Sequence, residues 1–407
     1  MNHLTKEDRR LSESREPGAY GSSTRAAFVV ICASLFVYLG LLLYHVAPYR
    51  YNLSSLIRIG AANPYFDPSA LEAGLVVFND PADGGDGYDG QFYYYMVKYL
   101  FMGEQSDVPN AFRYQRILYP LLAYAAALGH VQWLPVSMPA INLAAMAFGV
   151  WLLWLMIRNH LSAPHLALYA LNIGFLVAFF YDIATPLCIG LVVAGAYFYS
   201  REQWWPASVM LALSLLAQEN GAVVVAALCL WLAWKRRWNS ALILGAAFIP
   251  WLAWQMIIWR LYGGLPLLMS GNHLRLPFVG MASYIASFEV SSDWTALLRE
   301  ASVFPFMLFV IVLLLISARE MLKRPSDIML VIFAHAFIGI CFNSEQIWSS
   351  TISSPARALA GVFPFIILAY ANRRSRSLQL MILFCAFLTL MGIARILLMP
   401  PHPFYVT

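Results

Sequence analysis

Apolar segments long enough to cross a bilayer dominate the hydropathy pattern of this chain. The first covers residues 26–47, and about 20 apolar residues match the hydrocarbon thickness of a membrane. From residue 113 onward the apolar segments lie at 113–129, 136–157, 165–181, 183–200, 204–218, 220–234, 239–260, 302–319, 326–343, 354–371 and 377–398. The shorter ones suit tilted, broken or half-spanning helices that line a cavity. The pattern predicts an all-α, polytopic transmembrane helical bundle of about 11 to 13 spans.

Three polar segments complete the predicted organisation. Residues 1–25 contain too little apolar surface to fold, which predicts a disordered cytoplasmic tail. Residues 48–112 and 261–300 are too polar to cross a membrane and form the first and second outer loops. No Gly/Ser-rich linker divides the chain, so we expect residues 26–407 to form one transmembrane domain.

Composition supports a membrane protein and excludes several other classes. Of the 407 residues, 61% are hydrophobic and 12% are charged, whereas a soluble domain carries about 25% charged residues. The net charge of +5 gathers in short clusters that indicate membrane orientation and no nucleic-acid partner. All five cysteines fall inside apolar segments, which predicts no disulfide framework and no zinc site.

Basic clusters set the predicted orientation. Lys and Arg are enriched in short cytoplasmic loops, and such clusters occur at 235–237, 319–324 and 373–376. They place the N-terminus in the cytoplasm and the 48–112 loop outside. When the spans are counted forward from this loop through 113–129 and 136–157, the later connections fall on the opposite side of the membrane from the one that the basic clusters predict. Either 113–129 does not cross fully, or one short segment is miscounted.

The glycine-rich stretch that carries Asp86 and Asp89 is the first candidate for chemistry. Glycines allow sharp turns and close approach to a ligand, so the two carboxylates could act as a base or bind a divalent cation. An Asp-Gly turn with an N-cap explains the same residues. The aromatic run Phe92–Phe101 that follows predicts an amphipathic interfacial helix, whose rings anchor at the membrane surface.

Ionisable groups at the predicted outer ends of spans form the second candidate set. Arg113 and Arg116 lie one helical turn apart, where guanidinium groups bind a lipid phosphate or snorkel among headgroups. Asp182, Glu219, Glu345 and Arg357 either face a wet cavity or are exposed at the interface. No nucleotide-binding loop, nucleophile elbow or zinc motif occurs, which argues against ATP-driven transport by this chain.

The order of several short motifs resembles the GT-C superfamily of membrane glycosyltransferases, above all bacterial relatives of the GPI-anchor mannosyltransferases. The resemblance covers residues 26–235. It is carried by the first span followed by Asp86-Gly-Tyr-Asp-Gly-Gln91, Tyr114-Gln-Arg-Ile-Leu-Tyr-Pro-Leu-Leu122, Phe180-Tyr-Asp-Ile-Ala-Thr-Pro-Leu187 and Gln218-Glu219-Asn220. Asp182 stands where glutamate is more familiar, and Gln218-Glu219 replaces a more usual Arg-containing motif.

The resemblance implies transfer of a sugar from a polyprenyl-phosphate-linked donor to a lipid or envelope glycan acceptor, on the outer side of a bacterial inner membrane. Asp89, with Asp86 second, would be the catalytic base or would orient the acceptor or a divalent cation, and a raised pKa would suit proton abstraction. Arg113 and Arg116 would neutralise the lipid phosphate as it leaves. The remaining expected substrate contacts are Gln91, Gln115, Asp182, Glu219, Glu345 and Arg357.

A non-catalytic membrane protein is the competing interpretation. A transporter of lipid-linked saccharide, or a scaffold in a cell-surface polysaccharide assembly system, would keep the cavity and the arginines without needing the acids. Transporters commonly contain internal repeats, and the sequence shows none. This difference favours the enzyme.

Overall fold

The computed structural model describes residues 24–79, 85–103, 111–269, 273–290, 292, 294–348 and 353–398. Within these ranges the regular elements are helices, apart from one parallel strand pair in which β1 (Ile59–Gly60) lies beside β2 (Val77–Phe78). The all-α prediction is therefore confirmed. Most of the predicted tail lies outside the described residues, and its last two residues, Thr24 and Arg25, already begin a helix.

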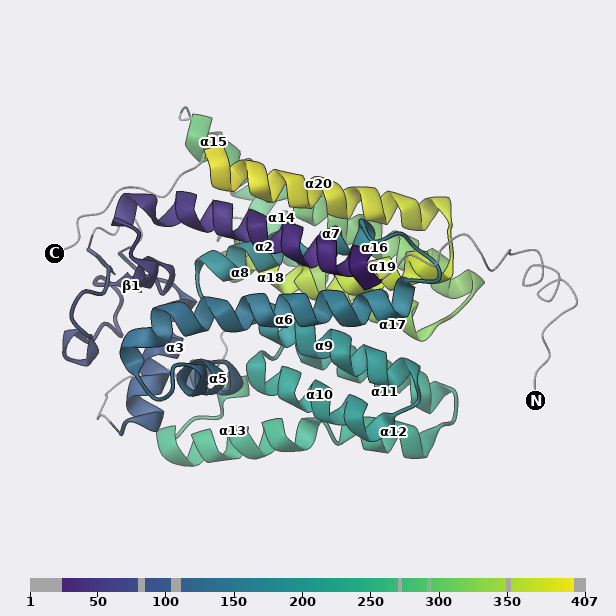
Figure 1. Ribbon diagram of the computed structural model, residues 1–407. Helices are drawn as coiled ribbons and strands as arrows, with labels where there is room; N and C mark the ends of the chain where they lie inside the picture. Colours follow the sequence, from purple (N-terminus) through teal and green to yellow (C-terminus); the bar gives the residue numbers. More distant parts are fainter. Residues whose placement is uncertain are drawn as a thin grey trace, which may run out of the picture.

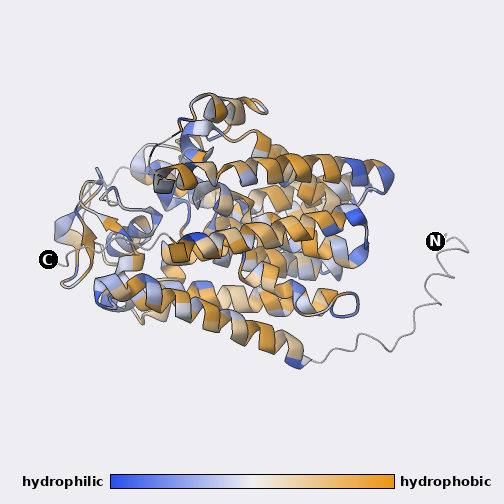
Figure 2. Cartoon of the chain, turned by 90° about the horizontal axis from the view of Figure 1, so that it is seen from above, coloured by the Kyte–Doolittle hydropathy of each residue, from blue (hydrophilic) through white to orange (hydrophobic). Residues whose placement is uncertain are grey.

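Long apolar helices lie side by side and form the body of the molecule (Figure 1). In the described part of the chain, six helical segments are long and apolar enough to cross a membrane. They are α2 (Thr24–Val46), α6 (Leu134–Ile157), α12 with α13 (Trp238–Gly245 and Phe248–Tyr262), α16 (Phe304–Lys323), α18 through α19 (Ser353–Leu359 and Phe363–Asn372) and α20 (Arg376–Leu398). Hydrophobic residues cover most of their length, and polar residues gather at the ends (Figure 2). The fold is that of a membrane protein.

Shorter helices fill the interior. α9 (Thr185–Ser200), α10 (Trp204–Ala217), α11 (Gly221–Trp234) and α17 (Asp327–Ile340) are apolar but fall below the length of a full span. α7 (His165–Ala170) and α8 (Ile173–Phe180) are shorter still, and the side chain of Asn172 caps α8 by accepting from the Phe175 amide. The count of 11 to 13 spans stays a prediction.

The segment 113–129, which upset the parity count, contains two short helices. α4 (Ala111–Tyr114) and α5 (Leu118–Ala126) have four and nine residues, and nine residues rise only about 14 Å, half the hydrocarbon thickness. This segment therefore does not cross on its own. The sequence left two explanations for the parity conflict, a segment 113–129 that does not cross fully or a miscounted short segment. The geometry supports the first.

The basic turns gather at one end of the bundle. The Arg373 side chain donates to the Arg324 carbonyl, that of Arg374 donates to the His160 carbonyl, and Arg237 pairs with Glu202 at 2.8 Å. α3 and the strand pair lie at the opposite end, called the α3 end below (Figure 1). This separation is the charge asymmetry that the sequence predicts.

The helix of the first polar loop packs into the protein and does not lie on its surface. α3 (Asp89–Met96) continues into one π-helical turn (Val97–Phe101). Every residue of α3 is buried, and the Tyr93 ring packs edge-on against that of Tyr119. The prediction of an interfacial helix with membrane-anchoring rings is wrong for α3, because its tyrosines pack against protein. Hydropathy cannot distinguish a ring buried in headgroups from one buried in a protein core.

The second polar loop lies over the α3 end. It contains α14 (Val279–Ala286) and α15 (Trp294–Ala301). The segment before α14 is bonded to the end of α17. Leu274 forms an isolated antiparallel bridge with Phe342, and the Phe278 amide donates to the Ile340 carbonyl. These contacts hold His273 and Leu274 beside the break between α17 and α18.

Two turns meet at the centre of the α3 end. One precedes α3 and the other joins α8 to α9, and the rings of Tyr88 and Tyr181 stack with centroids 4.4 Å apart. A Cβ atom at Gly90 would lie 2.6 Å from the Tyr181 carbonyl oxygen and 2.7 Å from that of Ile57. Only glycine allows this close approach. The contact fixes the depth of Asp89, the residue before Gly90.

Candidate functional site

A cavity of about 650 Å³ opens at the α3 end, within the range of about 300–1,000 Å³ that is typical of small-molecule sites. Its walls come from α3, α4, the α10–α11 connection, the 273–274 segment, the π-helical turn Ser344–Trp348 and α18. Its lining includes both charged and apolar residues. The apolar ones are Phe112, Val223, Leu274, Ile338, Phe342, Ile347 and Ala358.

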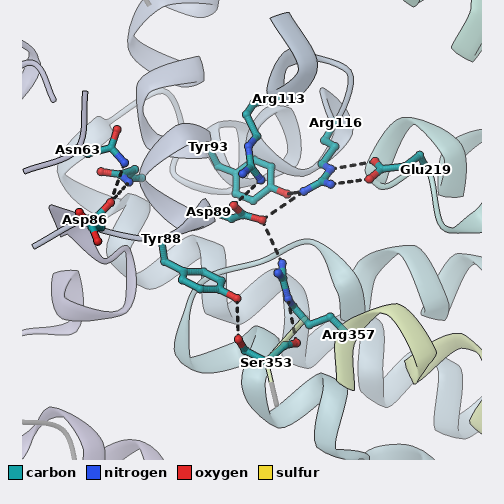
Figure 3. A network of polar contacts seen from close by, with 11 residues as sticks. Asn63, Asp86, Tyr88, Asp89, Tyr93, Arg113, Arg116, Glu219, Ser353 and Arg357 are labelled. Carbon is teal, nitrogen blue, oxygen red and sulfur yellow. Dashed lines mark hydrogen bonds and ion pairs between the residues drawn. The ribbon is translucent and has the colours of Figure 1, made fainter. Parts of the chain in front are cut away.

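Asp89 lies at the centre of the charged residues that line the cavity. It is the first residue of α3, preceded by Tyr88 in extended conformation, and it is 9% exposed. One carboxylate oxygen pairs with Arg113, and the other lies 3.0 Å from Arg357 and 3.5 Å from Arg116 (Figure 3). Three guanidinium groups from two segments thus converge on a single aspartate.

These arginines determine the charge state of Asp89. Burial alone would raise its pKa, but the guanidinium groups of Arg113, Arg357 and Arg116 outweigh burial and hold the pKa well below its usual range. The sequence-based expectation of a raised pKa is therefore wrong for this arrangement. In the state described, Asp89 is an ionised partner of the arginines and a weak base.

Arg116 links Asp89 to Glu219. Its Nε lies 2.9 Å from Glu219 Oε2 and its Nη2 lies 2.5 Å from Oε1, a bidentate pairing (Figure 3). Burial alone would raise the pKa of Glu219, but Arg116 holds it lower. The Arg116 Nη1 also lies 3.5 Å from the Tyr93 hydroxyl. Glu219 therefore fixes the orientation of the guanidinium that reaches Asp89.

The inner cluster carries an excess of positive charge. Three arginines stand against two carboxylates, those of Asp89 and Glu219, which leaves one positive charge. Glu345, a third acid lining the cavity, is an exposed residue. An anion that enters the inner part of the cavity is therefore attracted, and guanidinium groups match the geometry of phosphate oxygens.

The structure brings together seven of the residues proposed from the sequence. Asp89, Arg113, Gln115, Arg116, Glu219, Glu345 and Arg357 all line the cavity. Gln115 is 1% exposed, and its Oε1 accepts from Gln255 Nε2 at 2.8 Å. The predicted break between two late spans, with Glu345 and Arg357 on either side, forms one wall.

Asp86, Gln91 and Asp182 do not line the cavity. Asp86 is exposed, lies beside Asn63 and accepts from its side-chain amide through the backbone carbonyl (Figure 3). The Gln91 side chain is buried in the loop, where its Oε1 accepts from the Gly60 amide at 3.2 Å. Asp182 is fully buried. The three residues therefore lie outside this cavity, and the substrate contacts expected for Gln91 and Asp182 and the catalytic role expected for Asp86 stay predictions.

The divalent-cation hypothesis for Asp86 and Asp89 does not fit this geometry. The two acids do not share the cavity, and three arginines already surround Asp89. Within the described ranges, no three His, Cys, Asp or Glu side chains are grouped as metal ligands. Positive charge at Asp89 opposes the binding of a further cation.

Three residues of the polar network around Asp89 were not predicted from the sequence, namely Tyr88, Tyr93 and Ser353. Tyr88 lines the cavity, donates to the Ser353 hydroxyl at 3.0 Å, and lies under the Arg357 guanidinium at 5.1 Å. Tyr93 contacts Arg116. Tyr88 and Ser353 are 265 positions apart, so no local pattern links them. For Tyr88, the position next to Asp89 is the one signal that the sequence offered.

The sequence matches no family model, and no curated protein or solved structure is detectably similar to it. Function must therefore be argued from the geometry of the cavity.

Proposed function

We propose that this protein is a membrane glycosyltransferase of the GT-C type. It would move a sugar from a polyprenyl-phosphate-linked donor to a lipid or envelope glycan acceptor on the outer side of the membrane. One observation carries the proposal: a buried aspartate is held by three arginines at the wall of a cavity that also has apolar lining residues. A lipid-linked sugar phosphate has the matching parts, an anion and a hydrocarbon chain.

The donor phosphate would bind at the arginines. Arg113 has the most exposed guanidinium of the three, with 26% of its side chain accessible against 13% for Arg357 and 7% for Arg116. Arg116 is also retained by Glu219. We therefore expect Arg113 and Arg357 to turn to the phosphate while Arg116 stays in place. The first isoprenoid units would lie against the apolar lining residues Phe112, Phe342 and Ile347.

This exchange would convert Asp89 into a base. Burial raises the pKa of Asp89 whereas the arginines lower it, so phosphate bound to Arg113 and Arg357 removes most of the lowering influence. The acceptor hydroxyl oxygen then forms a bond to the anomeric carbon of the sugar, and the bond from that carbon to the phosphate oxygen breaks. The hydroxyl proton moves to Asp89, and polyprenyl phosphate leaves with its charge held by the arginines.

The test is transfer from a radiolabelled polyprenyl-phosphate sugar in membranes that contain the full chain. Asp89→Asn should lower the transfer rate by about 10²–10⁴-fold, the usual contribution of a general base. Asp86→Asn is the matched control, since it removes a carboxylate three positions away and outside the cavity, and should keep the rate. Activity in Asp89→Asn equal to wild type, at equal protein level, overturns the proposal.

Binding separates the enzyme from the competing transporter or scaffold. Arg113→Gln with Arg357→Gln should weaken binding of polyprenyl phosphate to the purified protein, because two phosphate-facing charges are lost. Asp89→Asn should bind it at least as well as wild type. A protein that binds polyprenyl phosphate but transfers no sugar, across the donors and acceptors of its own cell envelope, is a transporter or scaffold.

A further inference from the structure

The turn between α8 and α9 contains a second buried aspartate that the proposed reaction does not use. Asp182 is 0% exposed, has the left-handed backbone angle φ of 46°, and neither of its carboxylate oxygens has a hydrogen-bond partner. A buried charge without a partner costs several kcal/mol. Burial is the one cause that shifts the pKa of Asp182, and it raises it. No cationic side chain in the described part of the chain compensates this carboxylate.

Other oxygens around the turn also lack partners. Asn142 is 1% exposed and Thr185 is 0% exposed, and both Asn142 Oδ1 and Thr185 Oγ1 are unsatisfied. The Asn142 Nδ2 donates to the Ile183 carbonyl at 3.0 Å and to the Tyr119 hydroxyl at 2.9 Å. These two bonds fix which end of the amide is nitrogen, because a flipped amide would place oxygen against the Ile183 carbonyl.

Tyr119 cannot neutralise this group of oxygens. Its hydroxyl donates to the Met138 carbonyl at 3.0 Å and accepts from Asn142, so its one proton is already used. Asp182 lies near enough to raise the pKa of the Tyr119 phenol. Asp182 and Thr185 belong to the α8–α9 turn and Asn142 is bonded to it through the Ile183 carbonyl, so the unsatisfied oxygens of all three residues belong to or border one turn.

We propose that Asp182, Asn142 and Thr185 form a binding site for a dehydrated monovalent alkali cation, with Na⁺ as the expected ion. Hard cations are bound by carboxylate, amide, hydroxyl and carbonyl oxygens. The turn follows the C-terminus of α8, the end of a helix that favours positive charge, and buried helix ends with unwound backbone coordinate Na⁺ in membrane proteins. One carboxylate balances one charge, so a divalent ion would remain uncompensated.

A protonated Asp182 satisfies the region less completely. It would provide one hydroxyl donor, whereas four oxygens from three residues lack a partner. A cation contacts all of them at once.

Occupancy of this site affects the cavity through the contact between the two turns. Tyr181, next to Asp182, stacks on Tyr88 with centroids 4.4 Å apart, and its carbonyl packs against Gly90. A cation that orders the α8–α9 turn thereby orders the start of α3, where Asp89 lies. This is a role in positioning, separate from the chemistry of transfer.

The experiment is thermal unfolding of the purified full chain in detergent micelles at pH 8. NaCl replaces choline chloride at constant ionic strength, and KCl, LiCl and MgCl₂ are compared with it. The wild-type melting temperature should rise with Na⁺ and saturate, as expected for an ion that binds the folded state. Asp182→Asn should lose this rise. Thr185→Val keeps the carboxylate and the side-chain shape, and should weaken apparent Na⁺ affinity by about tenfold.

Glu202→Gln is the matched control, since it removes an exposed carboxylate at the opposite end of the bundle, and should keep the full Na⁺ response. A wild-type melting temperature that is the same in choline and in every alkali salt overturns the site. A sodium response that persists in both Asp182→Asn and Thr185→Val places the ion elsewhere and also overturns it. A response to Mg²⁺ alone overturns the monovalent assignment. Each outcome is read from stability, independently of glycosyl transfer.

Discussion

Two buried aspartates in touching turns have opposite electrostatic surroundings. Asp89 is 9% exposed and Asp182 is 0% exposed, so burial alone would raise the pKa of both. Three arginines hold the pKa of Asp89 well below its usual range, whereas that of Asp182 rises well above it. Burial places both carboxyls in the same medium, and the neighbouring charges decide which is ionised. Asp89 faces the cavity and Asp182 is enclosed by protein, so the variants of the two residues should differ in stability and in its dependence on pH.

The largest expected effect is a difference in stability between the two asparagine variants. Asp89→Asn leaves the buried Arg116 and the partly buried Arg113 and Arg357 with Glu219 as their one inner counter-charge, and removal of one partner of a buried ion pair costs about 3–5 kcal/mol. Asp182→Asn in sodium-free choline buffer at about pH 5 removes no ion pair and should change the free energy of unfolding by less than about 1 kcal/mol. Denaturant unfolding in mixed micelles measures both.

If Asp182→Asn proves the more damaging variant in choline buffer, Asp182 has a cationic partner and the contrast between the two turns fails. Arg113→Gln is a further check on Asp89, because it should restore part of the stability that Asp89→Asn loses.

The next effect is a dependence of stability on pH. Asp89 has a lowered folded-state pKa, so its contribution to stability is present above its unfolded pKa of about 3.9 and is lost only as pH falls below that value. Asp182 has a raised folded-state pKa, so its contribution is complete below about pH 3.9 and is lost as pH rises. In choline buffer above about pH 3.9, the wild-type free energy of unfolding should fall by up to about 1.4 kcal/mol per pH unit for as long as Asp182 stays protonated.

Asp182→Asn should flatten this pH profile, and saturating NaCl should reduce its slope in the wild type. Asp89→Asn should leave the slope unchanged over the same range. A slope that disappears in Asp89→Asn and persists in Asp182→Asn would reverse the assignment of the two carboxyls.

The smallest expected effect concerns the hydrogen bond beside the two turns. Tyr88→Phe keeps the stack on Tyr181 but removes the bond to Ser353, which should cost about 0.5–1.5 kcal/mol. Ser353→Ala should cost a similar amount, and the double variant should cost less than the sum because both changes remove one bond. Strict additivity would show that this bond contributes nothing.

Hydropathy predicts the class of fold well, because a helix that faces lipid is apolar along its length. It also locates the connections between spans, so Arg116, Glu219 and Arg357 could all be proposed as members of one end of the bundle. Their mutual contacts could not be predicted. Asp89 and Arg357 are 268 positions apart, and a single sequence contains no information on which distant turns meet.

Burial is the main difference between the sequence-based picture and the structure. The sequence predicts that Gln91, Asp182 and the tyrosines of α3 face water, substrate or headgroups, because polar and aromatic residues near span ends usually do. In the structure, Gln91 and these tyrosines are buried in the first loop, and Asp182 is buried in the turn between α8 and α9. This burial depends on close backbone approach at Gly90 and Gly60, and the composition of the loop does not reveal it.

The pairing of Asp89 with Arg357 has a consequence for biosynthesis. Asp89, Arg113, Arg116 and Glu219 are synthesised early, but Arg357 lies in α18 and emerges only after α17. Until α18 enters the membrane, the growing chain has the α3 turn without one of its walls. The last helices therefore complete the cavity, and a chain truncated before α18 keeps the earlier helices but lacks Arg357 in its charged centre.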